Sequence, residues 1–328
     1  MSEVDEFISN FNQDEKMLLS WGKLVCQKIR DELKLINKDN ILKIEPCFRV
    51  KDLSSLIEKA FYRFKGYKNP YKDITDKVGV RFVVLLTDDI EHIKVIIQNS
   101  PLWSFSEDRD FEKEKADKPY LFDYQSVHYI VKNLDEIKGE NGVIIPSGTP
   151  CEIQIRTLLQ HAYAEVSHDS VYKCKAIPSS DIKRRMARTI ALMESTDELF
   201  LAAKNELNKS NEVIEKWAEL SRILFSKIDV NYDTLKKDKI LYHILNLYYE
   251  SLTEQLFKSY SSYLEKNTDY EEYFKGKIKS ESLSGSYIKK SAAIIFCLFM
   301  ADKRFQIFKE RWPFSEADLN EITSIVGK

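Results

Sequence analysis

The chain has 328 residues, 43% of them hydrophobic and 31% charged, with a formal net charge of −2. This length suggests two domains, and the nearly balanced charge excludes a global attraction to nucleic acid. The chain has five cysteines and no CxxC pair, which argues against a disulfide framework and against a zinc module. It also lacks a leader-like start and a long apolar run, so we expect a cytoplasmic protein without a membrane span.

The N-terminal half is predicted to alternate between helices and strands. An amphipathic helix is expected over residues 13–36, where apolar side chains recur at helical spacing. The apolar, partly β-branched run at residues 82–86 predicts a central strand that is covered on both faces. Asp88 is expected to cap the helix over residues 90–97. Short elements of both kinds continue to about residue 157, so we expect an α+β domain.

A predicted strand at residues 151–157 carries polar side chains at every second position. Side chains alternate across a strand, so Glu152, Gln154 and Arg156 share one face while the intervening isoleucines fill a core. A structural, half-buried strand would also alternate, although its wet face would more often carry Lys, Thr or Ser. The row therefore indicates either a solvated face or a functional one.

Two upstream segments repeat this design. In the predicted strand at residues 124–131, Tyr124, Ser126 and His128 share one face. Asp76 stands at the mouth of the central strand. Two carboxylates on different strands, with an aromatic side chain and a histidine nearby, indicate a site for a metal ion and a nucleotide.

The C-terminal half is predicted to be helical. Strand signals end near residue 157, and a break at Pro178 precedes a helix of about 25 residues. Residues 267–286, with two glycines and many charges, predict a connector. We therefore expect residues 1–177 and 178–328 to form two domains, of which the second is all-α.

Five motifs follow one another between about residues 40 and 175. They are Arg49-Val50-Lys51 with Ser55 and Lys59, Asp76 to Arg81, Tyr124 to His128, Glu152 to Thr157, and Tyr163-Ala164 with His168 and Tyr172-Lys173. In this order they resemble the synthetase domain of the RelA/SpoT alarmone synthetases, and five ordered motifs are far more specific than any one of them. The resemblance implies a small, single-domain synthetase with a nucleotidyltransferase-like mixed β-sheet flanked by helices. The added C-terminal region is not covered by the motifs.

The activity that this resemblance implies is Mg²⁺-dependent transfer of pyrophosphate from ATP to the 3′-hydroxyl of GDP or GTP, which makes (p)ppGpp-type alarmones. The family pattern places Asp76 and Glu152 as the catalytic acids. Asp76 would bind Mg²⁺, and Glu152 would bind Mg²⁺ or activate the attacking hydroxyl. An isolated carboxylate is usually solvated, and only the motif set favours the functional role.

Cations before and within the central strand match the ATP-binding positions of the family. By resemblance, the guanidinium planes of Arg49 and Arg81 would sandwich adenine, since flat, delocalised cations stack on bases. Lys51, Ser55 and Lys59 would bind the triphosphate, and the start of the helix that holds Ser55 would add amide donors. The same residues could instead solvate an amphipathic element.

Three further positions match the acceptor site of the family. Tyr124 would stack on the guanine, Gln154 would position the acceptor, and His128 would contact a phosphate. Their ordinary alternatives are packing for the tyrosine and a satisfied core position for the histidine.

Two histidine patterns are discounted. His161, Glu165 and His168 fall on one helical face at metal-ligand spacing, but their order is not that of HExxH, and a packing role is preferred. The His168-Asp169 dipeptide resembles a hydrolase signature, yet only about 40 residues precede the synthetase match. We therefore expect no alarmone hydrolase activity.

The segment before the stacking tyrosine departs from the family pattern. The family usually has a Pro-Lys pair and a glycine there, whereas Pro119 is followed by Tyr120, and Asp123 takes the place of the glycine. A phosphate-binding cation is lost and an anion is gained, which leaves the acceptor open. Lys115 or Lys118 could supply the cation from another position.

Two alternatives to an alarmone synthetase follow. One is a toxin-like pyrophosphokinase that acts on the tRNA 3′ end or on adenosine nucleotides, and the other is a catalytically weak nucleotide-binding regulatory protein. The sequence leaves open the role of residues 178–328 and the oligomeric state. The basic residues of this region could form a surface that binds tRNA phosphates, but we prefer the interpretation that they belong to a solvated helix face. These residues are Lys289, Lys290, Lys303, Arg304, Lys309 and Arg311.

Overall fold

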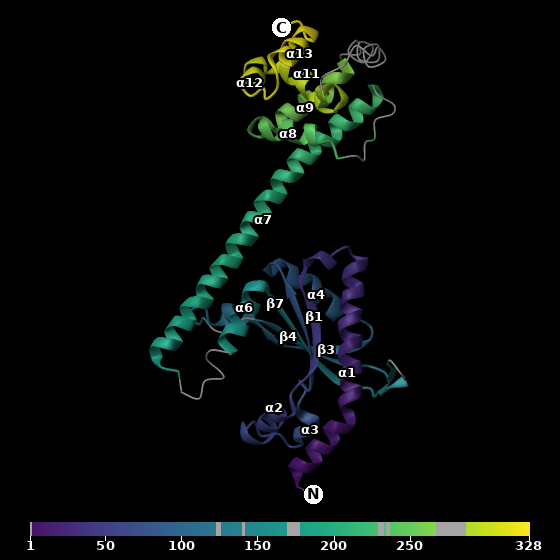
Figure 1. Cartoon of the computed structure of the whole chain (residues 1–328), viewed down its shortest axis with the longest axis vertical. Helices are drawn as coiled ribbons and strands as arrows, with labels where there is room; N and C mark the ends of the chain where they lie inside the picture. The colour runs from purple at the N-terminus through teal and green to yellow at the C-terminus, as the bar shows by residue number, and fades with distance from the viewer. Residues whose placement is uncertain are drawn as a thin grey trace. The chain divides into compact units, whose positions relative to one another are not determined.

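The chain packs as two compact units, Met1–Ala203 and Lys204–Lys328, which are described one at a time (Figure 1). The computed structural model describes residues 2–122, 126–139, 142–168, 178–228, 233, 237–266 and 287–328. The connector expected at residues 267–286 therefore lies outside the described residues.

The first unit is built on a mixed, five-stranded sheet with the strand order β1-β2-β7-β4-β3. Strands β2 and β7 are parallel, and the other three neighbouring pairs are antiparallel. A short hairpin, β5–β6, stands apart from this sheet. The strands are β1 (Leu42–Val50), β2 (Val78–Val84), β3 (Trp103–Asp110), β4 (Val127–Asn133), β5 (Ile137–Lys138), β6 (Ile144–Ile145) and β7 (Pro150–Thr157).

Two long helices, α1 (Glu3–Leu35) and α4 (Thr87–Asn99), pack on one face of the sheet and on each other. Alternate side chains of β2, β4 and β7 meet them in a single core, which includes Phe82, Tyr129 and Ile153. Helix α6 (Leu158–Ser167) packs on β7 and β2. The predicted central strand is therefore β2, and the side chains that alternate with its core residues are left for the opposite face.

Helix α1 begins earlier than the helix predicted over residues 13–36. Its N-cap is Ser2, whose hydroxyl oxygen accepts a hydrogen bond from the backbone N–H of Asp5 at 3.1 Å. Phe7 and Phe11 of this first part are buried. The capping box therefore fixes a start that apolar periodicity alone did not locate.

Shorter elements connect these layers. Helix α2 follows β1 directly, and α5 follows β3. Their bounds are η1 (Asp39–Ile41, a 3₁₀ turn), α2 (Leu53–Ile57), η2 (Glu58–Tyr62, a π-helical turn), α3 (Pro70–Asp73) and α5 (Phe111–Asp117).

Helix α7 (Ser180–Ile228) has 49 residues, about twice the length expected after Pro178. The reason is compositional, because residues 180–228 contain neither proline nor glycine to end the helix. In the first unit Ile190 and Asp197 of α7 are buried, and in the second unit Trp217 and Phe225 are buried.

The second unit is helical throughout its described residues, as predicted. Its core is centred on α11, in which every residue from Ala293 to Ala301 is buried. The elements besides α7 are α8 (Lys239–Leu247), η5 (Tyr249–Ser251), α9 (Glu254–Lys266), η6 (Tyr287–Lys290), α11 (Ala293–Lys303), α12 (Phe305–Glu310) and α13 (Glu316–Ile325). Among the described helices of the whole chain, none combines the length and the apolar character that a bilayer crossing requires.

Candidate active site

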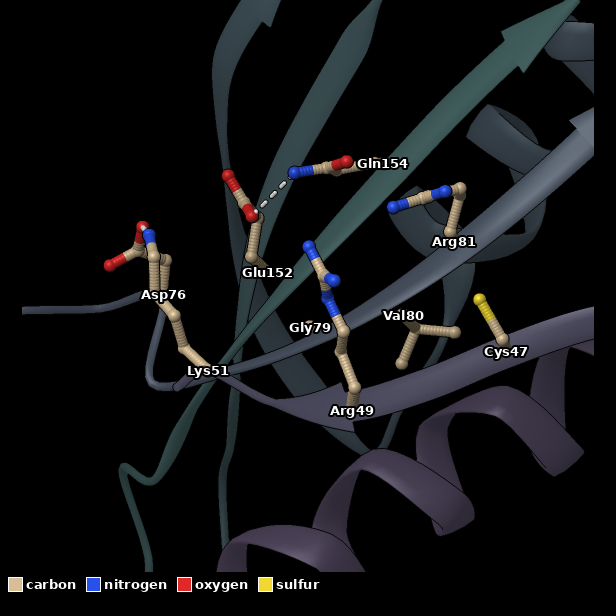
Figure 2. Close-up of a pocket in the computed structure, with 9 residues that line it drawn as sticks. All are labelled: Cys47, Arg49, Lys51, Asp76, Gly79, Val80, Arg81, Glu152 and Gln154. Carbon is tan, nitrogen blue, oxygen red and sulfur yellow. Dashed lines mark hydrogen bonds and ion pairs between the residues drawn. The ribbon is translucent and has the colours of Figure 1, made fainter. Parts of the chain in front are cut away.

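A cavity lies on the sheet face that the side chains of β1, β2 and β7 share, and Figure 2 shows the residues around it. Six of the ten predicted site residues line it, together with Cys47, Gly79 and Val80. The six are Arg49, Lys51, Asp76, Arg81, Glu152 and Gln154.

Strand register explains why residues so far apart in the sequence meet here. Arg49 on β1 lies opposite Gly79 on β2, and Gly79 lies opposite Glu152 on β7. In the neighbouring row, Arg81 lies opposite Gln154. Because cross-strand partners point to the same face, the register gathers the cations and the Glu152 carboxylate over one part of the sheet.

Asp76 lies just before β2 and is held by two lysines. Its Oδ2 atom is 2.5 Å from Lys51 Nζ and 2.7 Å from Lys59 Nζ, and its side chain is only 10% exposed. Burial acts to raise the pKa of Asp76, but the two ammonium groups more than offset it and hold the pKa below its ordinary value. The carboxylate is therefore charged at neutral pH.

The other oxygen of Asp76 is in a different situation. Oδ1 is buried and has no hydrogen-bond partner among the residues that the structure describes. A buried carboxylate oxygen without a donor is costly unless another group completes it.

Glu152 on β7 is held at both of its oxygens. His128 Nδ1 lies 3.1 Å from Oε1, and Gln154 Nε2 donates to Oε2 at 2.8 Å. Burial acts to raise the pKa of Glu152, yet His128 above all lowers it below its ordinary value, while the charge of Asp76 acts in the opposite sense. The two carboxylates thus interact and line the same cavity.

The two arginines differ in their surroundings. Arg81 Nη1 donates to Glu165 Oε1 on α6 at 2.8 Å. Within the described part of the chain, the guanidinium of Arg49 makes no ion pair, and it extends from β1 on the cavity side (Figure 2). Arg49 is therefore available to a ligand, and Arg81 is held in place from α6.

The remaining predicted residues lie at different distances from the cavity. Lys59 on η2 reaches it through Asp76, and His128 on β4 reaches it through Glu152. Ser55 lies in the first turn of α2, but Asp52 accepts its backbone N–H at 3.1 Å, so this amide is already engaged. Ser55 does not line the cavity. Tyr124 lies outside the described residues.

The sequence analysis did not predict that Gly79, Glu165 and Cys47 contribute to this site. Gly79 forms the floor of the cavity between Arg49 and Glu152. Its signal was available, because glycine inside an apolar strand often marks a close approach of a ligand. Glu165, which holds Arg81, was considered only within the discounted His161–Glu165–His168 pattern. Cys47 had no signal, since a lone cysteine is uninformative.

The described residues contain no group of three or more His, Cys, Asp or Glu side chains that could hold a metal ion. His161 Nδ1 lies 3.6 Å from Glu165 Oε1, and burial together with the charges of Arg81 and Arg156 lowers the pKa of His161. Any metal at the cavity would therefore depend on Asp76 and Glu152, with the rest of its ligands from outside the protein.

The first unit is thus an α+β domain whose mixed sheet carries two carboxylates and a group of cations around one cavity. Residues 48–177 match the model of the region found in RelA/SpoT proteins. The chain thus contains a RelA/SpoT-type domain, and the resemblance seen in its motifs is confirmed.

The chain is also similar to individual proteins and solved structures. GTP pyrophosphokinase YjbM of Bacillus subtilis (strain 168) is 26% identical over 170 residues, which cover 51% of this chain and 75% of that protein. The crystal structure of small alarmone synthetase 2 from Bacillus subtilis superposes with a TM-score of 0.50 at 19% identity, covering 60% of this chain and 99% of that chain. Small alarmone synthetase 1 from Bacillus subtilis gives a TM-score of 0.49 at 22% identity, covering 60% and 99% respectively. The likeness to synthetase 2 shows the fold.

Proposed function

We propose that the first unit transfers pyrophosphate from ATP to the 3′-hydroxyl of GDP or GTP in a Mg²⁺-dependent reaction. The proposal rests on one observation, that the carboxylates of Asp76 and Glu152 line the same cavity as Arg49, Lys51 and Arg81. The name of the relative, a GTP pyrophosphokinase, supports the same reaction class.

The donor set fits a magnesium ion. Asp76 Oδ1 is buried and lacks a hydrogen-bond partner among the described residues, and Glu152 supplies a second carboxylate in the same cavity. Mg²⁺ is typically bound by one or two carboxylates, with waters and substrate phosphates as its other ligands. When bound, the ion would neutralise charge on the phosphates.

The protein's own residues would then position and neutralise the donor nucleotide. Arg49 and Arg81 would stack on adenine, and Lys51 and Lys59 would turn from Asp76 to the triphosphate as it enters. Holding two polyanions together in this way removes much of the barrier to an in-line reaction.

The bond changes are simple. The 3′-oxygen of the acceptor attacks the β-phosphorus of ATP, the bond from that phosphorus to the α–β bridging oxygen breaks, and AMP leaves. The hydroxyl proton must go to a base. Glu152 is charged at neutral pH because its pKa is lowered, so it can accept that proton if it is near the attacking oxygen.

The surroundings of Tyr120 and Lys115 favour an alternative acceptor, one without a 5′-polyphosphate. Tyr120, which stands where the family has a phosphate-binding lysine, is 83% exposed, and Lys115 is paired with Glu194 at 2.6 Å and with Glu198 at 2.7 Å. A cation that could replace the missing lysine is therefore engaged by carboxylates. An acceptor without a 5′-polyphosphate, such as the tRNA 3′ end, would need fewer cations there.

An acceptor screen tests the proposal. Purified protein is incubated with γ-labelled ATP and Mg²⁺ and with GDP, GTP, ATP or bulk tRNA, side by side. We expect label on GDP or GTP, and we expect Asp76→Asn and Glu152→Gln each to lower the rate by roughly 10²–10⁴-fold. Asp181→Asn, an exposed carboxylate on α7, is the matched control and should leave the rate unchanged.

The outcomes separate the hypotheses. Label on tRNA alone assigns the toxin-like alternative, and a labelled ATP derivative with pyrophosphate on its 3′-oxygen assigns an adenosine acceptor. Intact ATP binding in calorimetry without transfer to any of the four acceptors would support the weak nucleotide-binding protein. Full activity of either carboxylate variant would remove Asp76 or Glu152 from the reaction.

A further inference from the structure

Three polar side chains of β7 form a chain of hydrogen bonds along one face of the strand. Arg156 Nη2 donates to Gln154 Oε1 at 2.7 Å, and Gln154 Nε2 donates to Glu152 Oε2 at 2.8 Å. Glu152 and Gln154 line the cavity, whereas Arg156 does not and is only 6% exposed. The buried arginine is thus linked to the cavity through Gln154.

The two ends of the Gln154 amide are chemically different, and its neighbours determine which way it turns. A guanidinium has only donors, so the atom of Gln154 that faces Arg156 must be the oxygen. An ionised carboxylate has only acceptors, so the atom that faces Glu152 must be the nitrogen. Both neighbours therefore require the same orientation of the Gln154 amide.

We propose that Arg156 is a positioning residue that fixes the Gln154 amide, so that Gln154 donates to Glu152 and offers N–H rather than carbonyl oxygen to the bound nucleotide. Without Arg156 one of the two hydrogen bonds that hold the amide is lost, and only the bond to Glu152 remains. The amide can then turn away from Glu152, which releases that carboxylate on one side. The ligand atom that Gln154 selects is therefore one with a lone pair, an oxygen or a ring nitrogen.

This inference rests on the proposed function, since its consequence is a change in how well Glu152 serves the transfer. Arg156 lies beside the cavity, two residues beyond Gln154 on β7, and does not line it, so its loss should act on the alignment of reacting groups more than on the binding of ATP. Misalignment of a reacting group lowers kcat, while KM for ATP depends on contacts that the substitution does not touch.

The test is a double-mutant cycle with the acceptor that the screen identifies. Arg156→Met removes the donor, Arg156→Lys keeps a charged donor, and Gln154→Ala removes the amide. We expect Arg156→Met and Gln154→Ala each to lower kcat by roughly tenfold with KM for ATP within about twofold. Arg156→Lys should recover most of the loss. The double variant Arg156→Met/Gln154→Ala should be no slower than Gln154→Ala alone, because Arg156 then has nothing to orient.

A structural role gives a different pattern. If the double variant loses the product of the two single effects, or if Arg156→Met weakens ATP binding as much as it lowers kcat, Arg156 does not act through Gln154 and the proposal is overturned. Thermal melting of each variant separates unfolding from misalignment, and Gln154→Ala removes the same link without touching the buried charge. Absence of transfer by the wild-type protein would count against the proposed function, whereas wild-type turnover with unaffected Arg156→Met would count against this inference alone.

Discussion

The carboxylate of Asp76 shows at the scale of one residue how the site is arranged before any ligand arrives. Two lysines neutralise one of its oxygens, and the other is buried without a donor among the described residues. Removing a partner from a buried charge is costly, because the remaining charge is left uncompensated. Lys51 and Lys59 can therefore leave Asp76 only when another cation takes their place. We expect this exchange to accompany the binding of a ligand in the cavity.

Gly79 gives a direct test of where the nucleotide lies. A Cβ at this position would meet only ordinary contacts, 3.6 Å from the Glu152 carbonyl oxygen and 3.8 Å from Glu152 Oε2, so the strand can accept a side chain. Gly79→Val would fill the floor of the cavity and should weaken ATP binding by roughly tenfold or more, since it removes space that a ligand must occupy.

Isothermal titration with ATP and Mg²⁺ measures this effect, and Gly79→Ala serves as the smaller step in the same series. The melting temperature should change little for either variant, because the added atoms point away from the core. Unchanged ATP affinity for Gly79→Val would place the nucleotide elsewhere.

Single residues also show what the sequence could and could not predict. Glu152, Gln154 and Arg156 could be assigned to one face because alternation along a strand is a local property. The hydrogen bonds from Gln154 and His128 to Glu152 could not, because they depend on side-chain conformation and on strand register that only the folded sheet sets.

At the scale of elements, helix type was predictable and helix length was not. Apolar periodicity identified α1, and the break at Pro178 identified the start of α7. However, α1 begins at a cap before the periodic stretch, and α7 continues through sequence without a breaker. The sheet was recognised from its polar rows and motifs. Its order, with parallel β2 and β7 side by side, is a long-range property that no local pattern contains.

Helix α7 is fixed to the first unit by a buried carboxylate. Thr157, the last residue of β7 and the N-cap of α6, donates through Oγ1 to Asp197 Oδ2 at 2.7 Å. Burial raises the pKa of Asp197, and the hydrogen bond from Thr157 offsets this only in part. The contact therefore connects α7 to the strand that carries Glu152, at an energetic cost for the charged form.

This cost predicts a pH-dependent effect of Asp197→Asn. A carboxyl group whose pKa is higher in the folded state than in the unfolded state favours folding when protonated, so its contribution declines as the pH rises through the range above 3.8. The amide stays neutral and can still accept from Thr157. We expect the variant to be more stable than the wild type at pH 8, by about 1 kcal/mol, with a smaller gap near pH 4.5.

Urea unfolding of the full chain at the two pH values measures the gap. Asp181→Asn on the same helix is the control, because the Asp181 side chain is 70% exposed and its ion pair with Arg185 lies at the surface, where such pairs contribute little to stability. A variant that is less stable than the wild type at pH 8 would mean that the charge of Asp197 is better compensated than its burial indicates.

At the scale of the whole molecule, the second unit offers limited support for a tRNA surface. Of the basic residues proposed from the sequence, Lys303 pairs with Asp302 at 3.0 Å, and Arg311 pairs with Glu250 at 2.6 Å and donates to the Leu247 carbonyl oxygen. Cations already paired with carboxylates contribute less to phosphate binding. These contacts favour a solvated face, which stays a prediction that the acceptor screen with bulk tRNA tests.

The place where the chain divides can be tested by truncation. The sequence places a boundary at residue 178, while the packed first unit extends to Ala203 and includes the buried Ile190 and Asp197 of α7. A chain ending at residue 203 should keep these contacts. A chain ending at residue 177 should be less stable by about 2–3 kcal/mol, because it loses a fully buried isoleucine and leaves its apolar surroundings open to water.

Urea unfolding of both truncated chains, followed by the fluorescence of Trp21 and Trp103 in the core of the first unit, measures the difference. Ile190→Ala in the chain ending at residue 203 should give a loss between the two, which assigns the effect to packing rather than to length. Equal stability of the two chains would place the boundary at residue 178 and make the first part of α7 a dispensable addition. A loss of the expected size would instead make the first part of α7 a structural part of the first unit, which it contacts through the hydrogen bond from Thr157 at the end of β7 to Asp197.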